Sequence, residues 1–273
     1  MTKVSVVIPT MPGREELLKK LLSTIPDEYE KIIVDDENLL LAAKRNKGAL
    51  KATGKYLLFI DDDNYLDDVA ILRMYLAFCE SVGVMGMVAC YDDKPRIIAD
   101  GGSIRYYLTG FMRGLFTNKN IRALPDKFYE VSEVANAFMI RRDVFEKVGG
   151  FDEINFPIDL DEADICKRIK NMGYKIVMNP TSICYHKSIT YSHIPDFRRP
   201  MNAYFMGRNR ILYQKKHLCK PKLLIYFLFF FPIFYLSYVA CLLYRGKPSM
   251  VIHFTKGVFD GIRNCFQNPY QQR

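Results

Sequence analysis

The stretch KYLLFIDDDN, residues 55–64, places three consecutive carboxylates directly after a run of five apolar residues. An unbroken apolar run is typical of a strand that is buried on both faces, as in a parallel sheet. Three carboxylates at the end of such a strand repel one another and shift one another's pKa values, so a cation or a hydrogen-bond donor must lie close to them. The stretch therefore predicts a buried strand with a charged site at its carboxyl end.

Two similar strands precede this one in the sequence. KVSVVIP at residues 3–9 and KIIVDD at 31–36 are rich in β-branched residues, and helical patterns follow them at 15–25 and 39–53. This alternation predicts an α/β fold with a mainly parallel sheet flanked by helices. In such sheets ligands bind beyond the carboxyl ends of the strands. The polar or chain-turning residues at these ends are therefore the first candidates for a binding site: Pro9, Thr10, Asp36, Asp61, Asp62 and Asp63.

The rest of the N-terminal part continues the same pattern with one irregular region. After residue 64 the patterns predict a helix, a strand, an irregular region with β-structure, a strand–helix–turn unit and a helix–strand unit, at 66–82, 82–91, 92–130, 134–153 and 161–178. Gly173 has the position of a residue that ends a helix. We expect residues 1–197 to form one domain.

The positive charge of the chain is concentrated in its C-terminal third. The formal net charge is +9, and residues 198–222 hold eight Lys or Arg and no acid, while 245–273 hold five and a single Asp. These two stretches carry more positive charge than the whole chain, so the first 197 residues are slightly acidic. The distribution favours a membrane surface as the partner of the basic part and argues against nucleic acid.

Between the two basic stretches lies a segment that predicts membrane contact. Residues 223–244 carry no charge and have about the 20-residue length of a helix that crosses a bilayer. Both flanks are basic, so the distribution of charge does not choose an orientation. Pro232 near the middle permits either a kinked span or a re-entrant hairpin. A buried core helix remains the alternative to both.

The two flanks and the N-terminus complete this expected arrangement. Residues 198–222 form a basic juxtamembrane segment, and 245–273 form an amphipathic tail. The N-terminus lacks the pattern of a signal peptide, so we expect the catalytic part to face the cytoplasm. Seven cysteines without C-x-x-C spacing predict reduced thiols, most of them in the core.

The acidic trio has a direct chemical interpretation. Asp61 and Asp63 are separated by one residue, so their side chains project to the same side and can share Mg²⁺ or Mn²⁺. Such an ion also takes phosphate oxygens and neutralises a diphosphate leaving group. A solvated turn or a helix N-cap would give the same sequence pattern.

Other polar positions allow a functional and a structural interpretation. Asp36 could accept a hydrogen bond from a base or a ribose, or it could simply end its strand in solvent. In DLDEADICKR, residues 159–168, Asp161 and Glu162 point about 100° apart on a helix. A carboxylate there suits a general base, although acids at a helix start also complement the helix dipole. His186 ends an apolar strand and is either a packing residue or a third metal ligand.

Taken in order, the blocks resemble the family 2 nucleotide-sugar glycosyltransferases of GT-A fold. The likeness covers roughly residues 1–190 and rests on the order of VSVVIPT, VDD, KRNKGALKATGKYLLFIDDD, MIRRDVFEKVGGFDE, DEADICKRIKNMGYKI and NPTSICYH. The later blocks look most like a rhamnosyltransferase-type branch. The resemblance implies an inverting, metal-dependent hexosyl transfer from a UDP-, GDP- or dTDP-sugar to a hydroxyl or lipid-phosphate acceptor. It also implies a nucleotide sugar, a lipid-linked or glycan acceptor and membrane lipids as partners.

The resemblance carries roles onto individual residues. Pro9, Thr10, Arg14, Asp36 and Arg45 would contact the nucleotide, together with Asp61 and Asp62. The metal would lie on Asp61, Asp63 and His186. The family's Glu-Asp pair appears here with the two acids exchanged, as Asp161-Glu162. Glu162 is the favoured base because it has the pair's second place, and Asp161 is the alternative.

Two other functions are compatible with parts of the sequence. A sugar nucleotidyltransferase would have a glycine-rich loop after the first strand, but PTMPGREE holds only Gly13. A non-catalytic membrane partner could keep the fold, and the exchanged acidic pair is compatible with it. The chain also lacks a QxxRW block and any Trp, which argues against a processive synthase.

Overall fold

The computed structural model describes residues 3–135, 137–187 and 200–263. These residues divide into two compact units. Of the described residues, the first unit holds 3–104, 113–153 (without 136) and 161–187. The second unit holds 105–112, 154–160 and 200–263.

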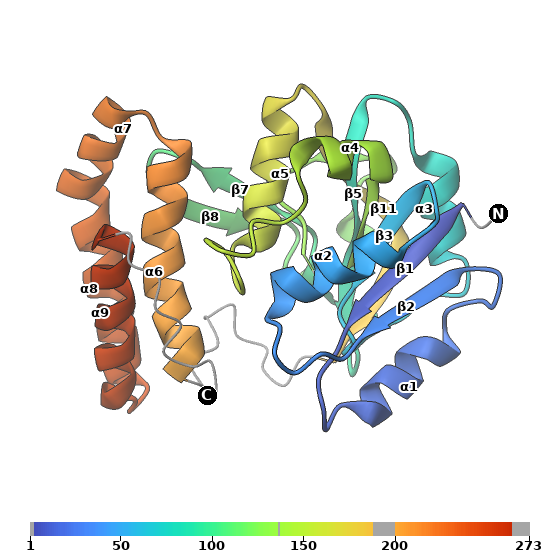
Figure 1. Ribbon diagram of the computed structural model, residues 1–273, viewed down its shortest axis with the longest axis horizontal. Coiled ribbons are helices and arrows are strands. Elements are labelled where there is room, and N and C mark those ends of the chain that lie inside the picture. The colour runs from blue at the N-terminus through green and yellow to red at the C-terminus, as the bar shows by residue number, and fades with distance from the viewer. Residues whose placement is uncertain (1–2, 136, 188–199, 264–273) are drawn as a thin grey trace. The chain divides into compact units, whose positions relative to one another are not determined.

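The first unit opens with the predicted strand–helix alternation (Figure 1). Its first five elements are β1 (Val4–Pro9), α1 (Glu15–Ser23), β2 (Glu30–Val34), α2 (Leu41–Lys51) and β3 (Tyr56–Ile60). Every residue of β1 and β3 is buried, as the unbroken apolar runs predict. The expected helices and strands of this half are therefore confirmed, with ends that differ by a few residues.

The remaining elements of the first unit extend the same sheet. They are β4 (Asn64–Leu66), α3 (Ala70–Ala77), β5 (Val82–Tyr91), β6 (Ile98–Asp100), the short 3-10 turn η1 (Ile121–Ala123), β9 (Tyr129–Glu130), β10 (Ala137–Arg141), α4 (Arg142–Val148), α5 (Asp161–Asn171) and β11 (Lys175–His186). The predicted helix over 66–82 was too long. Its first residue, Leu66, instead ends β4, because Tyr65 and Leu66 pair with Tyr185 and Cys184 of β11, and the helix itself covers only Ala70–Ala77.

The described strands form one mixed sheet of nine strands. Its order is β2-β1-β3-β10-β5-β11-β4, with β6 added to β5 and β9 added to β11. β1, β2, β3, β5 and β11 run in one direction, and β10 lies antiparallel between β3 and β5. Buried side chains pack on both faces of this sheet. The mixed, mainly parallel α/β architecture predicted from the sequence is thus confirmed.

Helix α2 lies unusually close to the sheet at Gly48. A Cβ atom on Gly48 would come within 2.3 Å of Cγ1 of Val7, so only glycine permits this approach. Arg45 lies three residues earlier and therefore on the same side of the helix. The close contact brings the inward-facing side of α2 against β1 and turns Arg45 towards the sheet.

A two-stranded sheet of β7 (Ser103–Tyr106) and β8 (Phe111–Gly114) contains residues of both units. It lies in the region 92–130, for which the sequence predicts irregular structure with β content. That expectation is confirmed by β6 to β9, which are short strands joined by turns.

The second unit is built on three helical segments. They are α6 (Pro200–His217), the continuous helix of α7 (Lys220–Ile225), η2 (Tyr226–Phe230) and α8 (Phe231–Tyr244), and α9 (Pro248–Arg263). η2 is one π-helical turn directly before Pro232. Proline lacks an N–H and its ring clashes with the carbonyl four residues earlier, and a wider turn relieves that clash.

The segment Lys220–Tyr244, hereafter the apolar helix, is one candidate membrane helix among the described residues. Its mean hydropathy is 2.1, and 11% of its most apolar window is buried. A core helix of a soluble protein would be mostly buried, so the low burial argues against that alternative. The helix is continuous through Pro232, and no return turn interrupts it.

Helices α6 and α9 pack through glycines. A Cβ atom on Gly257 would lie 2.0 Å from the carbonyl oxygen of Tyr204, and one on Gly207 would lie 2.4 Å from that of Phe254. The two backbones therefore touch, which side chains larger than hydrogen would prevent.

Two further expectations concern the domain boundary and the cysteines. The predicted boundary between residues 1–197 and 198–222 falls outside the described residues, as does the end of the predicted tail at 264–273, so the domain division stays a prediction. Six cysteines lie in the described part, and all six are free thiols. Three of them are buried, and Cys241, which was expected in the apolar segment, lies partly exposed in the apolar helix. Cys79 and Cys219 are exposed, so the core assignment was wrong for these two.

Candidate active site

The carboxyl ends of β1 and β3 bring Thr10 and the acidic trio together. The Thr10 hydroxyl donates to Oδ2 of Asp62 over 2.6 Å. Arg14, from the turn after β1, reaches Oδ1 of Asp62 at 3.0 Å and Oδ2 of Asp63 at 2.7 Å. Part of the counter-charge that the sequence pattern led us to assign to a metal ion is therefore supplied by an arginine.

Arg45 supplies a second part of the counter-charge. This residue of α2 is fully buried, and its Nη1 lies 2.6 Å from Oδ2 of Asp161 and 2.7 Å from Oε1 of Glu162. Its Nη2 lies 2.8 Å from Oδ1 of Asp61. One guanidinium thus joins the acid at the end of β3 to both acids at the start of α5.

The two acids of α5 differ in exposure and in protonation. Asp161 is fully buried, whereas 18% of the Glu162 side chain is accessible. Burial, and then the charge of Glu162, raise the pKa of Asp161 well above its usual range. Burial acts on Glu162 as well, but the charge of Arg45 and a hydrogen bond with Asp161 outweigh it and hold the Glu162 pKa low. Of the two acids, Asp161 therefore holds a proton more tightly, and Glu162 is the one that ionises more readily.

Asp61 has a raised pKa in the same group. Burial, opposed by the charge of Arg45, raises the Asp61 pKa to about 6. About a quarter of its side chain remains accessible to solvent, at 27%. The single positive charge of Arg45 therefore does not neutralise all three acids around it, and this part of the site can accommodate a further cation.

Asp63 and His186 face each other at the ends of β3 and β11. Oδ1 of Asp63 lies 3.4 Å from Nε2 of His186. Burial acts to raise the pKa of Asp63, but His186 and Arg14 together hold it below its usual value. Burial acts to lower the pKa of His186, but Asp63, with Asp61 and Asp100, raises it. His186 is therefore not merely a packing residue, because its imidazole is paired with a predicted site carboxylate.

The same pair is the strongest candidate for a metal site. No set of three or more His, Cys, Asp and Glu side chains within residues 3–135, 137–187 and 200–263 has an arrangement that could hold an ion by itself. A carboxylate and an imidazole nevertheless suit Mn²⁺, and ions of this kind commonly complete their shell with substrate phosphates and water. Asp63 and His186 fit such a site, and Asp61 fits it less directly because Arg45 holds its Oδ1.

The nucleotide-side residues lie at the ends of β1 and β2. Pro9 is the last residue of β1 and pairs with Val34, and the Thr10 N–H continues this link to the Val34 carbonyl over 3.0 Å. Asp36 accepts from Lys47 over 2.7 Å, and this hydrogen bond holds its pKa below the usual value. Asp36 is not in the Arg45 cluster, and its carboxylate is engaged by α2.

Lys44 is a charged residue of this region that was not predicted from the sequence. It is buried beside Arg45 on α2, and its ammonium donates to the Thr10 carbonyl over 2.6 Å. Burial lowers its pKa despite the nearby acids. The signal in the sequence was that Lys44 and Arg45 have helical spacing with the small residues Ala42, Gly48 and Ala49, which are buried with them.

Asp164 has a structural contact in the first unit. Its Oδ2 accepts from Nε of Arg168 over 2.7 Å, and the same guanidinium donates to the carbonyls of Val148 and Gly150. The acid two residues after Glu162 therefore helps to hold the Gly-Gly turn after α4.

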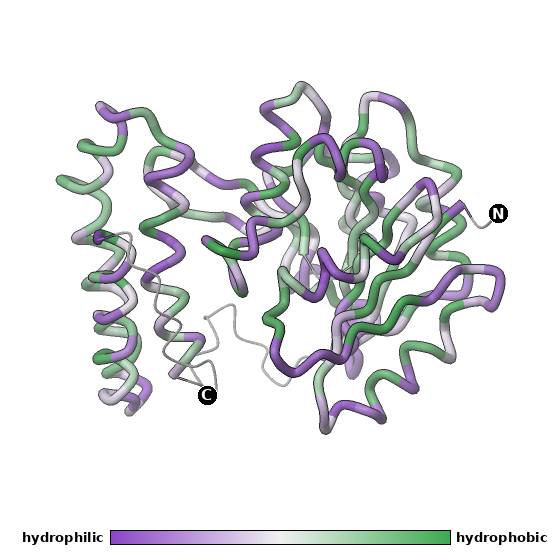
Figure 2. The backbone as a smooth tube through the Cα atoms, viewed as in Figure 1, coloured by the Kyte–Doolittle hydropathy of each residue, from purple (hydrophilic) through white to green (hydrophobic). Residues whose placement is uncertain are grey.

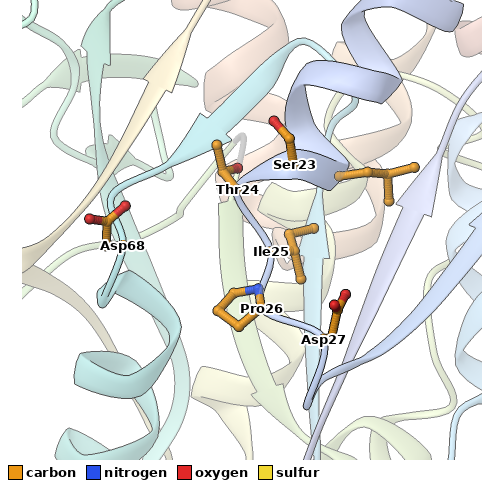
Figure 3. A pocket seen from close by; sticks show the side chains of 7 residues that line it. Ser23, Thr24, Ile25, Pro26, Asp27 and Asp68 are labelled. Atoms are coloured by element: carbon orange, nitrogen blue, oxygen red, sulfur yellow. The ribbon is translucent and has the colours of Figure 1, made fainter.

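A pocket of about 440 Å³ lies away from these residues, after helix α1 (Figure 3). Asp27 and Asp68 line it, with the segment between Leu22 and Pro26. The Thr24 hydroxyl in its wall donates to the Leu21 carbonyl and accepts from the N–H of Leu66. None of the predicted site residues lines this pocket.

The arrangement of strand-end acids, buried arginine and paired histidine agrees with a match over most of the chain. The family model described as "Glycosyltransferase like family 2" matches residues 6–214. The chain belongs to this glycosyltransferase family. The match includes the ends of β1, β2 and β3, the start of α5 and His186, so every predicted site residue lies inside it.

A curated relative comes from Haloferax volcanii. It is "Glucosyl-dolichyl phosphate glucuronosyltransferase", and it is 24% identical over 208 residues, which are 68% of this chain and 60% of the relative. The chain therefore spans about three fifths of the length of that relative.

Solved structures of glycosyltransferases share the fold. A mannosyltransferase from Pyrobaculum calidifontis in complex with GDP-Man and Mn²⁺ is 13% identical, with a TM-score of 0.56, over 97% of this chain and 88% of that one. GalNAc-T7 with UDP, GalNAc and Mn²⁺ is 16% identical, with a TM-score of 0.57, over 79% of this chain and 51% of that one. These similarities confirm the GT-A type of fold. The rhamnosyltransferase-type branch stays a prediction.

Proposed function

We propose that this protein transfers a sugar from a nucleoside-diphosphate donor to an acceptor hydroxyl or lipid phosphate at a membrane. The observation that carries this proposal is the convergence of Asp61, at the end of β3, and Glu162, at the start of α5, on Arg45. Asp63 and His186 stand beside this group, on a strand end where ligands bind in such sheets. Family membership supports the same chemistry.

Glu162 is the proposed general base. Its pKa is held low and its side chain is partly accessible, whereas the pKa of Asp161 is raised and its side chain is fully buried. The Glu162 carboxylate accepts the proton of the acceptor hydroxyl as the acceptor oxygen forms its bond to the anomeric carbon. The bond from that carbon to the diphosphate oxygen breaks on the opposite face, and the nucleoside diphosphate leaves with the electron pair. The product has inverted configuration.

Asp63 and His186, with Asp61, would hold Mg²⁺ or Mn²⁺. Such an ion supplies charge neutralisation at the diphosphate when it is bound. The chain's own groups act around it: Arg14 fixes the carboxylates of Asp62 and Asp63, and Arg45 fixes that of Asp61. Fixed carboxylates need little rearrangement when the donor enters, which favours donor binding.

The nucleotide side is proposed to be the end of β1 and β2. The chain turns there at Pro9 and Thr10, and the Lys44 ammonium donates a hydrogen bond to the Thr10 carbonyl. Asp36 would meet the base or ribose after release from Lys47. The mannosyltransferase of similar fold was solved with GDP-Man, and GalNAc-T7 was solved with UDP. A nucleotide sugar is accordingly the proposed donor class.

The membrane setting is proposed on two grounds. The apolar helix is largely unburied, and basic residues flank it at both ends. The Haloferax relative is named for a dolichyl phosphate substrate, which is a membrane lipid. We propose that the catalytic residues face the cytoplasm and that the acceptor is lipid-linked or membrane-proximal.

The test is a nucleotide-release assay. Membranes that contain the full chain are incubated with a panel of UDP-, GDP- and dTDP-sugars, Mn²⁺ or Mg²⁺ and lipid phosphate acceptors. We expect the wild type to release nucleoside diphosphate only when an acceptor is present. The variant Asp63→Ala should lose this release and should also lose metal-dependent donor binding. Asp67→Ala is the matched control, because Asp67 is an acid on the surface after β4 that contacts Arg73.

Two other outcomes would overturn the proposal. Release of pyrophosphate would indicate a sugar nucleotidyltransferase. The absence of donor binding and of release across the whole panel would indicate a non-catalytic membrane partner with the same fold.

A further inference from the structure

The apolar helix exposes one long face. Six of its large apolar side chains are each 55% to 64% exposed: Leu224, Leu228, Phe229, Ile233, Leu236 and Leu243. Tyr226, Phe234 and Leu242 are buried on the other side. A solvent-exposed face of this size marks an interaction surface rather than ordinary surface variation.

Helix α9 widens this face. It runs beside α8, as Figure 1 shows, and Phe254 packs on Phe234, Tyr235 and Tyr238. Ile252 and Phe259 of α9 are 71% and 55% exposed, and exposed Lys256 lies between them on the same helix side. In Figure 2 the hydrophobic colour continues along both helices, interrupted by hydrophilic positions on α9. Apolar residues mixed with lysine are typical of a helix that lies in the headgroup region.

Polar groups of neighbouring segments lie against the other side of the apolar helix, near its middle. The guanidinium of Arg210, on α6, lies 4.0 Å from the ring centre of Phe234, and Phe234 is near the midpoint of Lys220–Tyr244. The same guanidinium donates to the Gly110 carbonyl over 2.6 Å. A cation and a non-helical turn of the second unit therefore stand level with the centre of the apolar helix.

More polar groups lie along the neighbouring helices. Asp260 of α9 accepts from the Tyr204 hydroxyl over 2.9 Å, and Lys215 of α6 donates to the Ile262 carbonyl over 2.8 Å. α6 and α9 touch backbone to backbone, so they cannot separate from each other without losing that contact. Any membrane position of the apolar helix must therefore be shared by these two helices.

A perpendicular position would be expensive. It would place the guanidinium of Arg210 at the depth of the hydrocarbon core, where a charged side chain is unfavourable even on the most lenient insertion scale. A helix that lies in the membrane plane avoids this cost, because its polar side stays above the headgroups.

We propose that the apolar helix and α9 form an in-plane membrane-binding face and that Lys220–Tyr244 does not cross the bilayer. The occupant of the face is the surface of a phospholipid bilayer that contains anionic lipid. Lys220 and Lys222 at one end, and Arg245 and Lys247 at the other, meet the headgroups while the six apolar side chains enter the boundary of the hydrocarbon core. The proposal rests on the membrane association proposed above but is independent of the transfer chemistry.

The decisive experiment labels both ends of the apolar helix. Cys219 and Ser249 are both exposed and flank the helix. Two matched variants of the full chain are made, one that keeps Cys219 and one with Cys219→Ser and Ser249→Cys, both with Cys79→Ser, Cys241→Ser and Cys265→Ser. Each is bound to preformed sealed vesicles of phosphatidylcholine and phosphatidylglycerol and treated with a membrane-impermeant maleimide before or after mild detergent.

An in-plane helix leaves both positions equally labelled before and after detergent. Protection of one position until detergent is added would show that the helix crosses the bilayer and would overturn the proposal. Failure of both proteins to float with the vesicles would overturn it as well, because no lipid face would then exist. Donor binding, measured on the same samples, reports separately on the transferase proposal.

A second measurement tests which side chains meet the lipid. Leu228→Glu with Leu236→Glu should reduce flotation about tenfold, because each change puts a charge on the exposed face that is proposed to enter the lipid. Leu76→Glu is the control, since Leu76 is a leucine of α3, 72% exposed, that lies outside the proposed face. Equal flotation of the two proteins would contradict the assignment of the face, and unchanged circular dichroism excludes unfolding as the cause of a loss.

Discussion

The guanidinium of Arg45 joins acids that would otherwise repel one another. It bonds to Asp61, Asp161 and Glu162, and its flat face lies 5.5 Å from the ring centre of Phe138. Three directed contacts from one fork require the planar geometry of arginine, and lysine has only a point charge to offer. Both the protonation and the position of these three acids therefore depend on the Arg45 side chain.

Replacement of Arg45 by leucine should destabilise the protein. The change leaves buried carboxylates without their cation, and breaking a buried pair in this way costs about 3 to 5 kcal/mol. Arg45→Lys should cost less, because the positive charge remains. Denaturant unfolding of the two variants measures the difference, and equal stability of wild type and Arg45→Leu would contradict the role assigned to Arg45.

Glu162→Gln should separate binding from turnover. An amide keeps the shape and the contact with Arg45 but cannot accept the acceptor proton, so turnover should fall about 10²- to 10⁴-fold. Donor binding, measured by calorimetry, should persist. Normal turnover of Glu162→Gln would show that Glu162 is not the base, and Asp161 would then be the candidate.

Asp161→Asn provides the matched comparison for that experiment. Because the raised pKa of Asp161 favours its neutral form, an amide replaces a group of the same charge and still offers a hydrogen-bond donor to Glu162. Turnover of Asp161→Asn should therefore exceed that of Glu162→Gln. The reverse order would show that the charge lies on Asp161.

At the scale of elements, a single carboxylate ties β2 to its neighbours. Glu30 accepts from the Ser5 hydroxyl of β1 and from the Thr53 N–H, the latter over 2.8 Å. Burial acts to raise the Glu30 pKa, but these hydrogen bonds outweigh it and hold the pKa below its ordinary value of 4.5. The ionised form of Glu30 thus helps to join two strands and the loop before β3.

The stability that Glu30 adds should depend on pH. A depressed pKa gives a contribution that is complete above pH 4.5 and is lost as the pH falls through the folded-state pKa. Glu30→Gln should cost about 1 to 2 kcal/mol at pH 7 and progressively less below pH 4.5. Urea unfolding across this range measures the change, with exposed Glu28→Gln as the control. A cost that stays constant with pH would contradict the prediction.

The glycine contact of α6 and α9 gives a second prediction for elements. Alanine favours a helix by about 1 kcal/mol over glycine, so Gly257→Ala would stabilise a free helix. Here its Cβ would meet the Tyr204 carbonyl oxygen at 2.0 Å, and the helices would have to separate, at a cost of about 1 to 3 kcal/mol. A lowered melting temperature is expected. Lys256→Ala, at an exposed neighbouring position, should leave it nearly unchanged, and a gain of stability in Gly257→Ala would refute the close packing.

On the scale of the whole molecule, the second unit combines three distant parts of the chain. Asn209 of α6 donates to the carbonyls of Ile158 and Asp159, and Arg208 donates to that of Asn155. Asp159 and Leu160 have left-handed backbones, which are strained for residues other than glycine. The segment directly before α5 is therefore held in place by α6.

Removal of residues 198–273 should leave a chain that does not fold well. The carbonyls of Gly110, Ile158 and Asp159 would lose their donors from α6, and the left-handed segment at Asp159 and Leu160 would lose the hydrogen bonds that hold it. We expect the fragment 1–197 to aggregate or to melt at a lower temperature than the full chain. A chain that ends at Arg263 and keeps α6 to α9 is the control, and a fragment as stable as that control would contradict the prediction.

The order of strands and helices was largely predictable from the sequence, because periodicity and apolar runs depend on neighbours along the chain. β1, α1, β2, α2 and β3 lie where the patterns placed them. β4 was missed, since three residues show no period and their pairing with β11 depends on residues about 120 positions away. The strand ends also indicated that three acids gather at the end of β3, and their roles stay predictions.

The sequence by itself determined the elements, the acids at the strand ends and the apolar helix, since each of these is a local pattern. Only the tertiary structure decided which cation neutralises which acid, because Arg45 and Asp161 are 116 residues apart and meet through the packing of α2 on the sheet. It likewise decided that polar groups stand beside the middle of the apolar helix. Hydropathy averages over all sides of a helix, whereas contact with a neighbouring helix distinguishes one side from another.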